Sequence, residues 1–315
     1  MKKLAFKLLA FMALLFISTF ILQKFIDKGL KNDSSDEYKE WNDIFLSRIN
    51  ADILFQGASR ARDHFSPHIF DSAFSMNSYN LGISGYGFNM QYYRFLIYLK
   101  YNKSPKYIIQ CIDEGSLGKR KDLFEYSQFL PYLNDSIIKE AIKGSEGLNW
   151  RDQYIPLYKY RSVYDRAFAG LIANFRKPPY NTMRYKGYFP QTGSSDTAFK
   201  SLKKRYPNGF RNQVNRTTLD LLTKFMDLCK AKGITVIFVD VPKYYPAQKM
   251  VINRDSIINI IKNYASNYHI PYLDYSNDSI CRDKANFYDY DHLNILGVKK
   301  FDIEIINDLK NIIKH

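Results

Sequence analysis

The sequence lacks the patterns that define several common protein classes. Only three cysteines occur among 315 residues, at Cys111, Cys229 and Cys281, and they form no CxxC pair. An odd number of widely spaced cysteines argues against a disulfide framework and against a cysteine zinc site. We expect Cys111 and Cys229 to be buried thiols, because both lie in apolar stretches.

Signatures of nucleotide and nucleic-acid binding are also missing. Neither G-x-x-x-x-G-K-[ST] nor G-x-G-x-x-G occurs, so we expect no nucleotide cofactor. The net charge of +15 comes from lysines and arginines that are spread along the chain. We expect this charge to be solvated surface, or to attract anionic lipid or acidic glycans, and we expect no nucleic-acid partner because no binding motif is recognisable.

The chain does have a long apolar segment at its start. Three lysines precede an uncharged run from Leu8 to Leu22, and a snorkelling lysine extends the usable span back to Leu4. A cleaved signal peptide needs small residues after this run, and residues 23–27 offer none, so we favour an uncleaved signal anchor. Lysines before the helix place the N-terminus in the cytoplasm. The rest would then face the periplasm or the exterior, held by a single pass through a bacterial inner membrane.

The remaining patterns suggest how the chain is divided. We expect residues 1–26 to be a cytoplasmic stub and transmembrane anchor, residues 27–48 a polar tether, and residues 49–315 one α/β domain. Residues 117–215, rich in Tyr, Arg, Asn and Pro, are expected as an insertion over the active face, with some helices and a long irregular part around 176–195.

Alternating strand and helix patterns predict the fold class of this domain. Short apolar runs bounded by turn signals predict buried parallel strands at 53–56, 78–81, 107–112, 235–240 and 271–273. Helical patterns cover 89–101, 217–232 and 298–312. Thr217 is expected to cap the second of these helices and Gly233 to end it. The alternation indicates a central parallel sheet with helices on both faces.

One serine follows the first predicted strand. Gly57-Ala58-Ser59 forms a turn into a helix, at the sheet edge where ligands of such folds bind. The first N–H groups of that helix are available to a developing oxyanion. A plain helix cap explains the same pattern without any catalysis.

A base for that serine is present near the C-terminus. Asp289 precedes His292 by three positions in FYDYDHLNILG, residues 287–297, so their side chains can bond to each other and fix the imidazole tautomer. Asp291 is an alternative carboxylate, and a turn that caps the last helix is the structural alternative. Asp289, Asp291 and His292 lack a fourth ligand, so we expect no metal site.

A third motif follows the second predicted strand. YNLGISGYG, residues 79–87, presents Asn80, Gly82 and Gly85. Glycines let the backbone approach a ligand, and a backbone N–H can point at an oxyanion. An ordinary strand-to-helix loop that needs positive φ is the alternative.

In this order the three motifs resemble the SGNH (GDSL-like) hydrolase superfamily, from about residue 50 to 315 apart from the insertion. The resemblance implies a three-layer flavodoxin-like fold. It also implies Ser59 as nucleophile, His292 as base, Asp289 as its partner and Gly85 as an oxyanion donor. From their place in the turn, we expect Ser59 and Arg60 beside the oxyanion as well.

The sequence departs from the family pattern at two places. Ala58 replaces the usual aspartate, and no asparagine follows the third strand in YIIQCIDEGSLG, residues 107–118, where Asp113, Glu114 or Ser116 stands instead. Loss of one oxyanion donor costs roughly 10²–10³ in rate. Either another group substitutes, for which the side chain of Arg60 or Arg62 and the N–H of Arg60 are the candidates, or the reaction with water is slow.

With these departures, the sequence resembles one branch of that superfamily, the membrane-anchored proteins of bacterial envelope acylation. This branch includes the teichoic-acid D-alanylation and alginate-acetylation accessory proteins. This resemblance implies an acyl-Ser59 intermediate, an envelope polysaccharide or glycolipid acceptor, and contact with membrane lipid and a membrane-bound O-acyltransferase. A carbohydrate or lipid esterase and a non-catalytic envelope scaffold are the alternatives. Candidate substrate-binding residues are Asn80, Arg62, Tyr244, Tyr245 and Asn294.

Overall fold

The computed structural model describes residues 1–35, 38–176 and 184–314. The chain divides into two compact units. Unit 1 comprises Met1–Leu46 and Lys121–Asn181, and unit 2 comprises Ser47–Arg120 and Thr182–His315. The expected insertion at 117–215 is thus shared between the units, and its residues 177–183 lie outside the described part of the chain.

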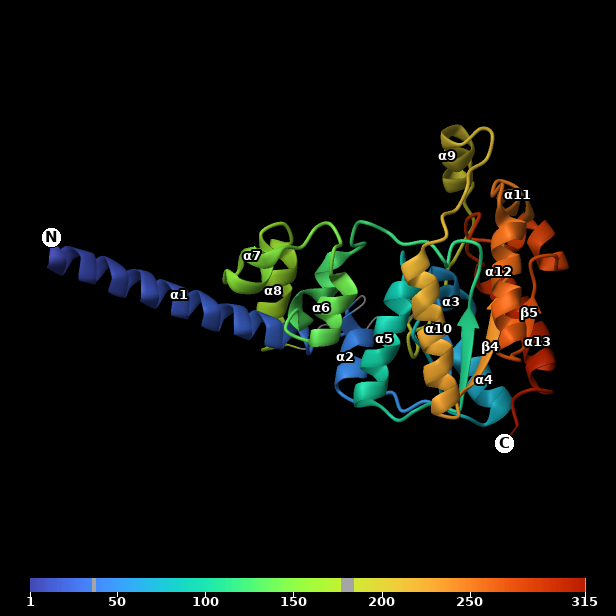
Figure 1. Ribbon diagram of the computed structural model, residues 1–315, viewed down its shortest axis with the longest axis horizontal. Helices are drawn as coiled ribbons and strands as arrows, with labels where there is room; N and C mark the ends of the chain where they lie inside the picture. Colours follow the sequence, from blue (N-terminus) through green and yellow to red (C-terminus); the bar gives the residue numbers. More distant parts are fainter. Residues whose placement is uncertain (36–37, 177–183, 315) are drawn as a thin grey trace. The chain divides into compact units, whose positions relative to one another are not determined.

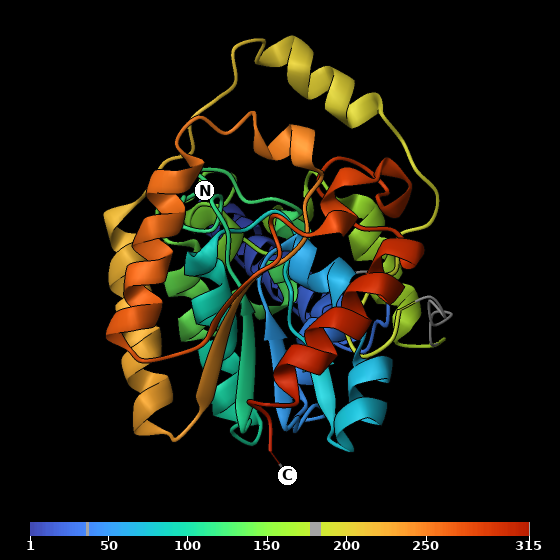
Figure 2. The same ribbon diagram turned by 90° about the vertical axis from the view of Figure 1, so that its right-hand side faces the viewer.

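Unit 2 is built on a five-stranded sheet in the order β2-β1-β3-β4-β5, and all its neighbouring strands pair in parallel (Figure 2). The order 2-1-3-4-5 is that of the flavodoxin-like, doubly wound folds. The predicted α/β fold is therefore confirmed, and the strands end within a residue of their expected positions. The strands are β1 Ile53–Gln56, β2 Ser78–Asn80, β3 Tyr107–Cys111, β4 Thr235–Asp240 and β5 Tyr272–Asp274.

Helices cover both faces of this sheet (Figure 2). On one face, the Phe225 ring of α10 packs against Phe88 and Phe95 of α5, with ring centroids 5.4 Å apart in each pair. A hydroxyl contact of 3.2 Å between Thr223 and Tyr264 joins α10 to α12. The helices of unit 2 are α3 Ser59–His64, α4 Pro67–Phe74, α5 Phe88–Tyr101, α9 Thr197–Arg205, α10 Arg216–Ala231, α11 Tyr245–Gln248, α12 Arg254–Asn267, α13 Ile295–Leu309, and the 3-10 turns η3 Ser279–Arg282 and η4 Lys284–Asn286.

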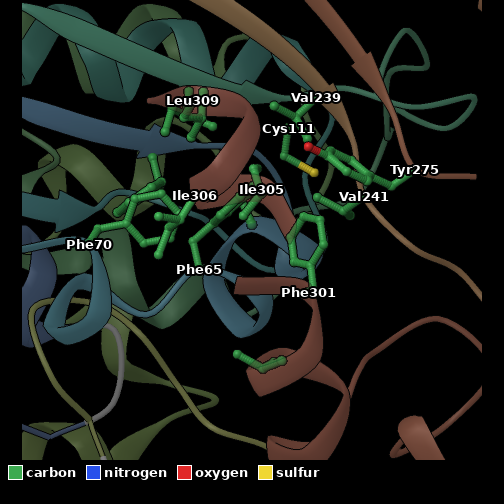
Figure 3. Packing of buried hydrophobic residues seen from close by; sticks show 14 of the residues in the cluster. Phe65, Phe70, Cys111, Val239, Val241, Tyr275, Phe301, Ile305, Ile306 and Leu309 are labelled. Atoms are coloured by element: carbon green, nitrogen blue, oxygen red, sulfur yellow. The ribbon is translucent and has the colours of Figure 1, made fainter. Parts of the chain in front are cut away.

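The opposite face carries the main apolar core, where α13 packs with α3 and α4 against the strands (Figure 3). Phe301, Ile305 and Leu309 recur at helical spacing along α13 and are fully buried. Burial of each such side chain contributes about 1.5–3 kcal/mol. This packing fixes the start of α13, and with it the Asp289–His292 loop that precedes the helix.

One predicted cap is wrong. Asn215, not Thr217, caps α10: its side-chain oxygen accepts the N–H of Thr218 at 3.2 Å. Asn215 has extended backbone angles, as a capping residue requires, whereas Thr217 is already inside the helix.

Unit 1 contains α1, which is long and apolar enough to cross a membrane and is a candidate membrane anchor or signal sequence (Figure 1). This helix runs past the expected boundary at residue 26, because Asp27, Gly29 and Leu30 are buried in unit 1. The remaining elements are α2 Tyr38–Phe45, η1 Tyr126–Tyr132, α6 Ser136–Ile142, α7 Trp150–Tyr154, η2 Tyr158–Tyr160 and α8 Tyr164–Ala173, and α1 itself spans Lys2–Leu30.

The stretch expected as a polar tether contains the folded helix α2. Trp41 of α2 is fully buried and donates its indole N–H to the side-chain oxygen of Gln128 at 2.9 Å. Ile44 is buried on the same helix. Residues 27–48 thus differ from a tether, because α2 carries a large apolar face among its charged residues.

Candidate active site

The turn after β1 presents Ser59 at the first position of α3. Gly57 has φ of +152°, and a Cβ at this position would lie 2.6 Å from that of Ala61 and 2.8 Å from that of Cys111. Only glycine fits this backbone and this packing. The tight turn brings the half-buried hydroxyl of Ser59 to the carboxyl edge of the sheet.

The loop before α13 is organised by Asp289. Its carboxylate accepts the backbone N–H of Asp291 at 2.7 Å and that of His292 at 2.8 Å. Both carboxylate oxygens of Asp289 also lie 3.0 Å from Nδ1 of His292. One side chain therefore shapes the loop and orients the imidazole.

The structure brings Ser59, His292 and Asp289 together in one hydrogen-bonded chain. Nε2 of His292 lies 2.8 Å from Oγ of Ser59, across a sequence separation of 233 positions. Because Asp289 accepts from Nδ1, Nε2 is the nitrogen left to accept the serine proton. The arrangement is that of a nucleophile, a base and an orienting carboxylate.

The pKa values of His292 and Asp289 follow from their burial and from the charges around them. Burial alone would lower the pKa of His292, but its bond to Asp289 and the nearby Asp291 carboxylate raise it above the ordinary value. Burial would raise the pKa of Asp289, but the bond to His292 lowers it below the usual range. Asp289 is therefore ionised at neutral pH and favours a positive charge on His292.

A second histidine supports the loop. Nε2 of His64, at the end of α3, accepts the backbone N–H of Leu293 at 2.9 Å. His64 is fully buried, and burial lowers its pKa well below the ordinary value, so the ring is neutral. Sequence reasoning missed this contact, because nothing in the neighbourhood of His64 along the chain signals a partner 229 positions away.

A cavity of about 380 Å³ opens beside Ser59. Of the expected oxyanion residues, Ser59, Gly85 and Arg60 all line it. Gly85 has a φ of +75°, which the alternative of an ordinary strand-to-helix loop also requires. Sequence reasoning missed much of the polar lining, which includes Lys119, Arg120, Asn212, Gln213, Lys243 and Tyr290.

Arg60 lies at the base of this cavity and is 5% exposed. Its guanidinium pairs with Asp113, and its Nε lies 4.0 Å from Oδ1 of Asp291. Within the described residues, Nη1 of Arg60 is buried and has no hydrogen-bond partner. Asp113, which stands where the resemblance would place an asparagine, thus holds an arginine beside the nucleophile.

Lys243 connects this arginine to a deeper group of charges. Its ammonium lies 2.8 Å from Oε1 of Glu114 and 3.1 Å from Oδ1 of Asp291. Burial would raise the pKa of Glu114, but Lys243 and Arg60 lower it to about 2. Glu114 is therefore a structural counter-ion, and its charge is already met by cations of the protein.

Arg254 completes the group from α12. It lies 3.7 Å from Glu114 and 2.6 Å from Asp240, at the end of β4. The buried-charge network is defined here as Arg60, Asp113, Glu114, Asp240, Lys243, Arg254 and Asp291.

Two predicted substrate-binding residues bond to the backbone and do not line the cavity. The amide of Asn80 donates to the carbonyls of Ala61 at 2.8 Å and Phe65 at 3.0 Å, so it holds the end of α3. Asn294 caps α13: its side-chain oxygen accepts the N–H groups of Leu296 and Gly297 at 3.0 Å each. Both amides thus have structural partners.

The other three candidates also lie outside the cavity lining. Arg62 pairs with Asp63 at 2.6 Å, and its guanidinium stacks over the ring of Phe189. The ring of Tyr244 packs 5.7 Å from that of Phe199 in α9, and Tyr245 lies under the guanidinium of Arg282. Phe199 also contacts Tyr290, which lines the cavity, so α9 packs on the residues beside the site.

No metal-binding group was found in the described part of the chain: no three His, Cys, Asp or Glu side chains there are arranged to hold an ion. Asp289 and Asp291 are occupied by His292 and Lys243.

No family model matches the chain, and no curated protein matches it. Similar solved structures include an acylhydrolase from Bacteroides fragilis, at 14% identity with a TM-score of 0.35 over 81% of this chain and 86% of that one. A GDSL-like lipase from Bacteroides thetaiotaomicron has 13% identity and a TM-score of 0.37, over 83% and 88%. A protein from Streptococcus pneumonia, described as a platelet activating factor, has 15% identity and a TM-score of 0.40, over 87% and 90%. The likeness is distant, so the fold assignment rests on the sheet order itself.

Proposed function

We propose that this protein is a serine-dependent acyl-transfer enzyme of the SGNH type, which moves an acyl group, in the first place acetyl, to or from hydroxyls of a cell-envelope polysaccharide. The observation that carries the proposal is the bonded chain of Ser59, His292 and Asp289 at the carboxyl edge of the sheet. A serine helix cap needs no histidine 2.8 Å from its hydroxyl.

The first half of the reaction acylates Ser59. Oγ attacks the carbonyl of a donor ester while Nε2 of His292 accepts the hydroxyl proton. The tetrahedral intermediate collapses, the bond to the donor alcohol breaks, and His292 gives its proton to that alcohol. In the second half an acceptor hydroxyl gives its proton to Nε2 of His292 and attacks the acyl carbonyl. The bond between the acyl group and Oγ of Ser59 then breaks, His292 returns the proton to Oγ, and the acceptor leaves as the new ester.

The oxyanion needs donors, and the cavity offers them. Backbone N–H groups at Ser59, Arg60 and Gly85 are the candidates, as in the sequence-based expectation. The side chain of Arg60 also lines the cavity beside Ser59, so we assign its positive charge a supporting electrostatic role.

The contacts of α1 favour an anchor that stays attached. The carboxylate of Asp27 accepts two hydrogen bonds, one from the ammonium of Lys159 at 2.9 Å and one from the hydroxyl of Tyr160 at 2.5 Å. The first small residue after the apolar run is Gly29, and cleavage there would remove the Asp27 carboxylate from a lysine that is 3% exposed. A buried ammonium without its partner is strongly destabilising, so we propose an anchored enzyme on the outer side of the membrane.

The test is intact mass of the detergent-solubilised full chain after incubation with p-nitrophenyl acetate. The wild type should gain about 42 Da, one acetyl group in place of a proton, and Ser59→Ala should gain nothing. Rapid release of p-nitrophenol in water alone would favour the esterase. An adduct that persists until an O-acetyl-accepting glycan is added would favour the transferase. If neither acetyl nor a fluorophosphonate labels Ser59, the non-catalytic scaffold replaces both.

A further inference from the structure

Large apolar side chains project into solvent from one side of α8. Tyr164, Phe168, Ile172 and Phe175 are 80%, 64%, 46% and 84% exposed, and their spacings of four, four and three residues place them on one helical face. The other side of α8 is buried at Gly170 and Ala173. This helix therefore presents an aromatic stripe that does not serve the core.

The neighbouring α7 adds to this surface. Trp150 is 61% exposed, Tyr154 68% and Ile155 40%. The helix is short but firmly set, because Asn149 and Asp152 form a capping box. We call these seven residues the aromatic face; they are Trp150, Tyr154, Ile155, Tyr164, Phe168, Ile172 and Phe175. Large apolar side chains gathered on a surface mark contact sites more often than scattered ones do.

Contacts within unit 1 place the aromatic face at the end of the membrane-crossing part of α1 (Figure 1). The backbone N–H of Leu157, just after α7, donates to the side chain of Gln23 at 2.7 Å. The Phe175 ring, just after α8, lies 5.8 Å from that of Phe25. Gln23 is the first residue after the uncharged run, so both helices meet α1 where the apolar segment stops.

The join between α1 and α8 is rigid. A Cβ on Gly29 would lie 1.7 Å from the carbonyl oxygen of Gly170, so the two backbones touch. The side chain of Asn174 donates to the carbonyl of Phe25 at 2.9 Å. If α1 spans a bilayer, α7 and α8 are therefore held at the level where the lipid headgroups lie.

The charges around the aromatic face suit a headgroup layer. Lys24 follows the apolar run, and its ammonium lies 5.4 Å from the ring of Phe20. Arg151 lies beside the Trp150 ring, with its guanidinium carbon 5.6 Å from the centroid, and Arg176 is exposed next to Phe175. Tryptophan and tyrosine concentrate at membrane–water boundaries, where cations meet lipid phosphates.

We propose that the aromatic face of α7 and α8 is a second membrane-binding element, which lies in the headgroup layer of the same bilayer that α1 crosses. The proposal requires α1 to remain in the membrane but is independent of the chemistry at Ser59. Its occupant is lipid, because the face begins where the lipid-spanning run of α1 ends, and it combines apolar rings with basic side chains.

Tryptophan fluorescence tests this directly, because the chain has two tryptophans, Trp41 and Trp150. Trp41 is fully buried, whereas Trp150 belongs to the aromatic face. The full chain is reconstituted into phosphatidylcholine vesicles with a minority of phosphatidylglycerol, with and without bromine on the acyl chains near the headgroup. We expect bromine to reduce wild-type emission roughly 1.5-fold or more and to leave Trp150→Phe, which reports Trp41 alone, nearly unchanged.

A second variant extends the measurement. Phe175→Trp in the Trp150→Phe background should restore the quenching, because Phe175 contacts Phe25 of α1. The proposal is overturned if bromolipid leaves wild-type emission unchanged while aqueous acrylamide quenches it; the face would then be free for a protein partner. It is equally overturned if the chain does not float with the vesicles. Acetylation of Ser59 is unaffected by either outcome, so the two proposals fail separately.

Discussion

Unit 1 and unit 2 both contain buried ion pairs, but unit 2 gathers its buried charges beside a cavity, whereas unit 1 also leaves apolar rings in solvent. Unit 2 buries charge: Arg60, Glu114 and Lys243 are each less than a tenth exposed beside the proposed nucleophile. Unit 1 exposes apolar rings, with Phe168 and Phe175 mostly in solvent. Desolvation disfavours buried charges, and the hydrophobic effect disfavours exposed apolar patches. Each therefore points to something outside the chain, a developing charge in unit 2 and a bilayer in unit 1.

The buried charges and the exposed rings differ in their consequences for stability. A buried charge must keep its partner, because an uncompensated ion in the interior is strongly destabilising. An exposed ring already meets water in the folded and the unfolded state, so removing it changes little. Substitutions should therefore damage the buried-charge network severely and leave the aromatic face folded.

The largest effect is expected from Lys243→Met. This change leaves Glu114, which is 1% exposed, without its closest cation. Breaking a buried pair costs about 3–5 kcal/mol in the free energy of unfolding, measured by urea denaturation followed by circular dichroism. Lys262→Met is the matched control, because Lys262 pairs with Asp274 at 3.5 Å on the surface, and such pairs contribute about 0–1 kcal/mol. Equal costs for the two variants would contradict the distinction.

The next effect concerns pH. His292 must be neutral to accept the proton of Ser59, and its raised pKa places the acid limb of the acylation rate above the ordinary histidine value of 6.5. The rate should therefore fall as pH drops through that limb. Asp291→Asn removes one carboxylate that raises this pKa and should move the limb to lower pH.

Single-turnover acylation of Ser59 between pH 5 and 9 measures this limb, and roughly this range covers histidine titration. Asp274→Asn, on β5, serves as the control and should leave the midpoint in place. A limb that does not move in Asp291→Asn would show that the network acts on the fold and not on the base.

The sheet was predictable because its strands carry local signals. Ile53–Gln56 and Thr235–Asp240 are apolar runs bounded by turn residues, and a parallel strand buried on both faces needs little else. The contact of Ser59 with His292 was predictable for a different reason. Ser59 follows the end of a strand, but His292 lies in the loop before α13, so their pairing across 233 positions was predicted from the chemistry of a serine nucleophile and from the resemblance to SGNH hydrolases.

The buried-charge network could not be predicted in the same way. Lys243 and Arg254 follow β4 among other lysines and arginines, and no local pattern separates a buried cation from a solvated one. Their partner Glu114 is likewise identified only by three-dimensional packing. Asn294, a predicted substrate-binding residue, shows the same limit, because its cap on α13 became visible only in the structure.

A smaller effect is expected from Asn294→Ala. Loss of a helix N-cap costs about 1 kcal/mol of stability, seen as a lower denaturation midpoint. The KM for p-nitrophenyl acetate should stay the same, because Asn294 does not line the cavity. Asn294→Asp keeps the oxygen acceptors for Leu296 and Gly297 and should recover most of the lost stability. A raised KM with unchanged stability would instead return Asn294 to substrate binding.

The smallest effect on folding is expected in the aromatic face. Phe168→Ser should change the free energy of unfolding by no more than about 0.5 kcal/mol in detergent, as surface substitutions usually do. Phe129→Ala is the contrast within the same unit, because Phe129 is fully buried against Trp41, with ring centroids 5.7 Å apart. Loss of such a ring costs about 3–5 kcal/mol. If Phe168→Ser proves as damaging as Phe129→Ala, the ring of Phe168 belongs to the core of unit 1. If it is neutral in detergent, the fold does not account for Phe168, and a membrane contact gives the reason for its exposure.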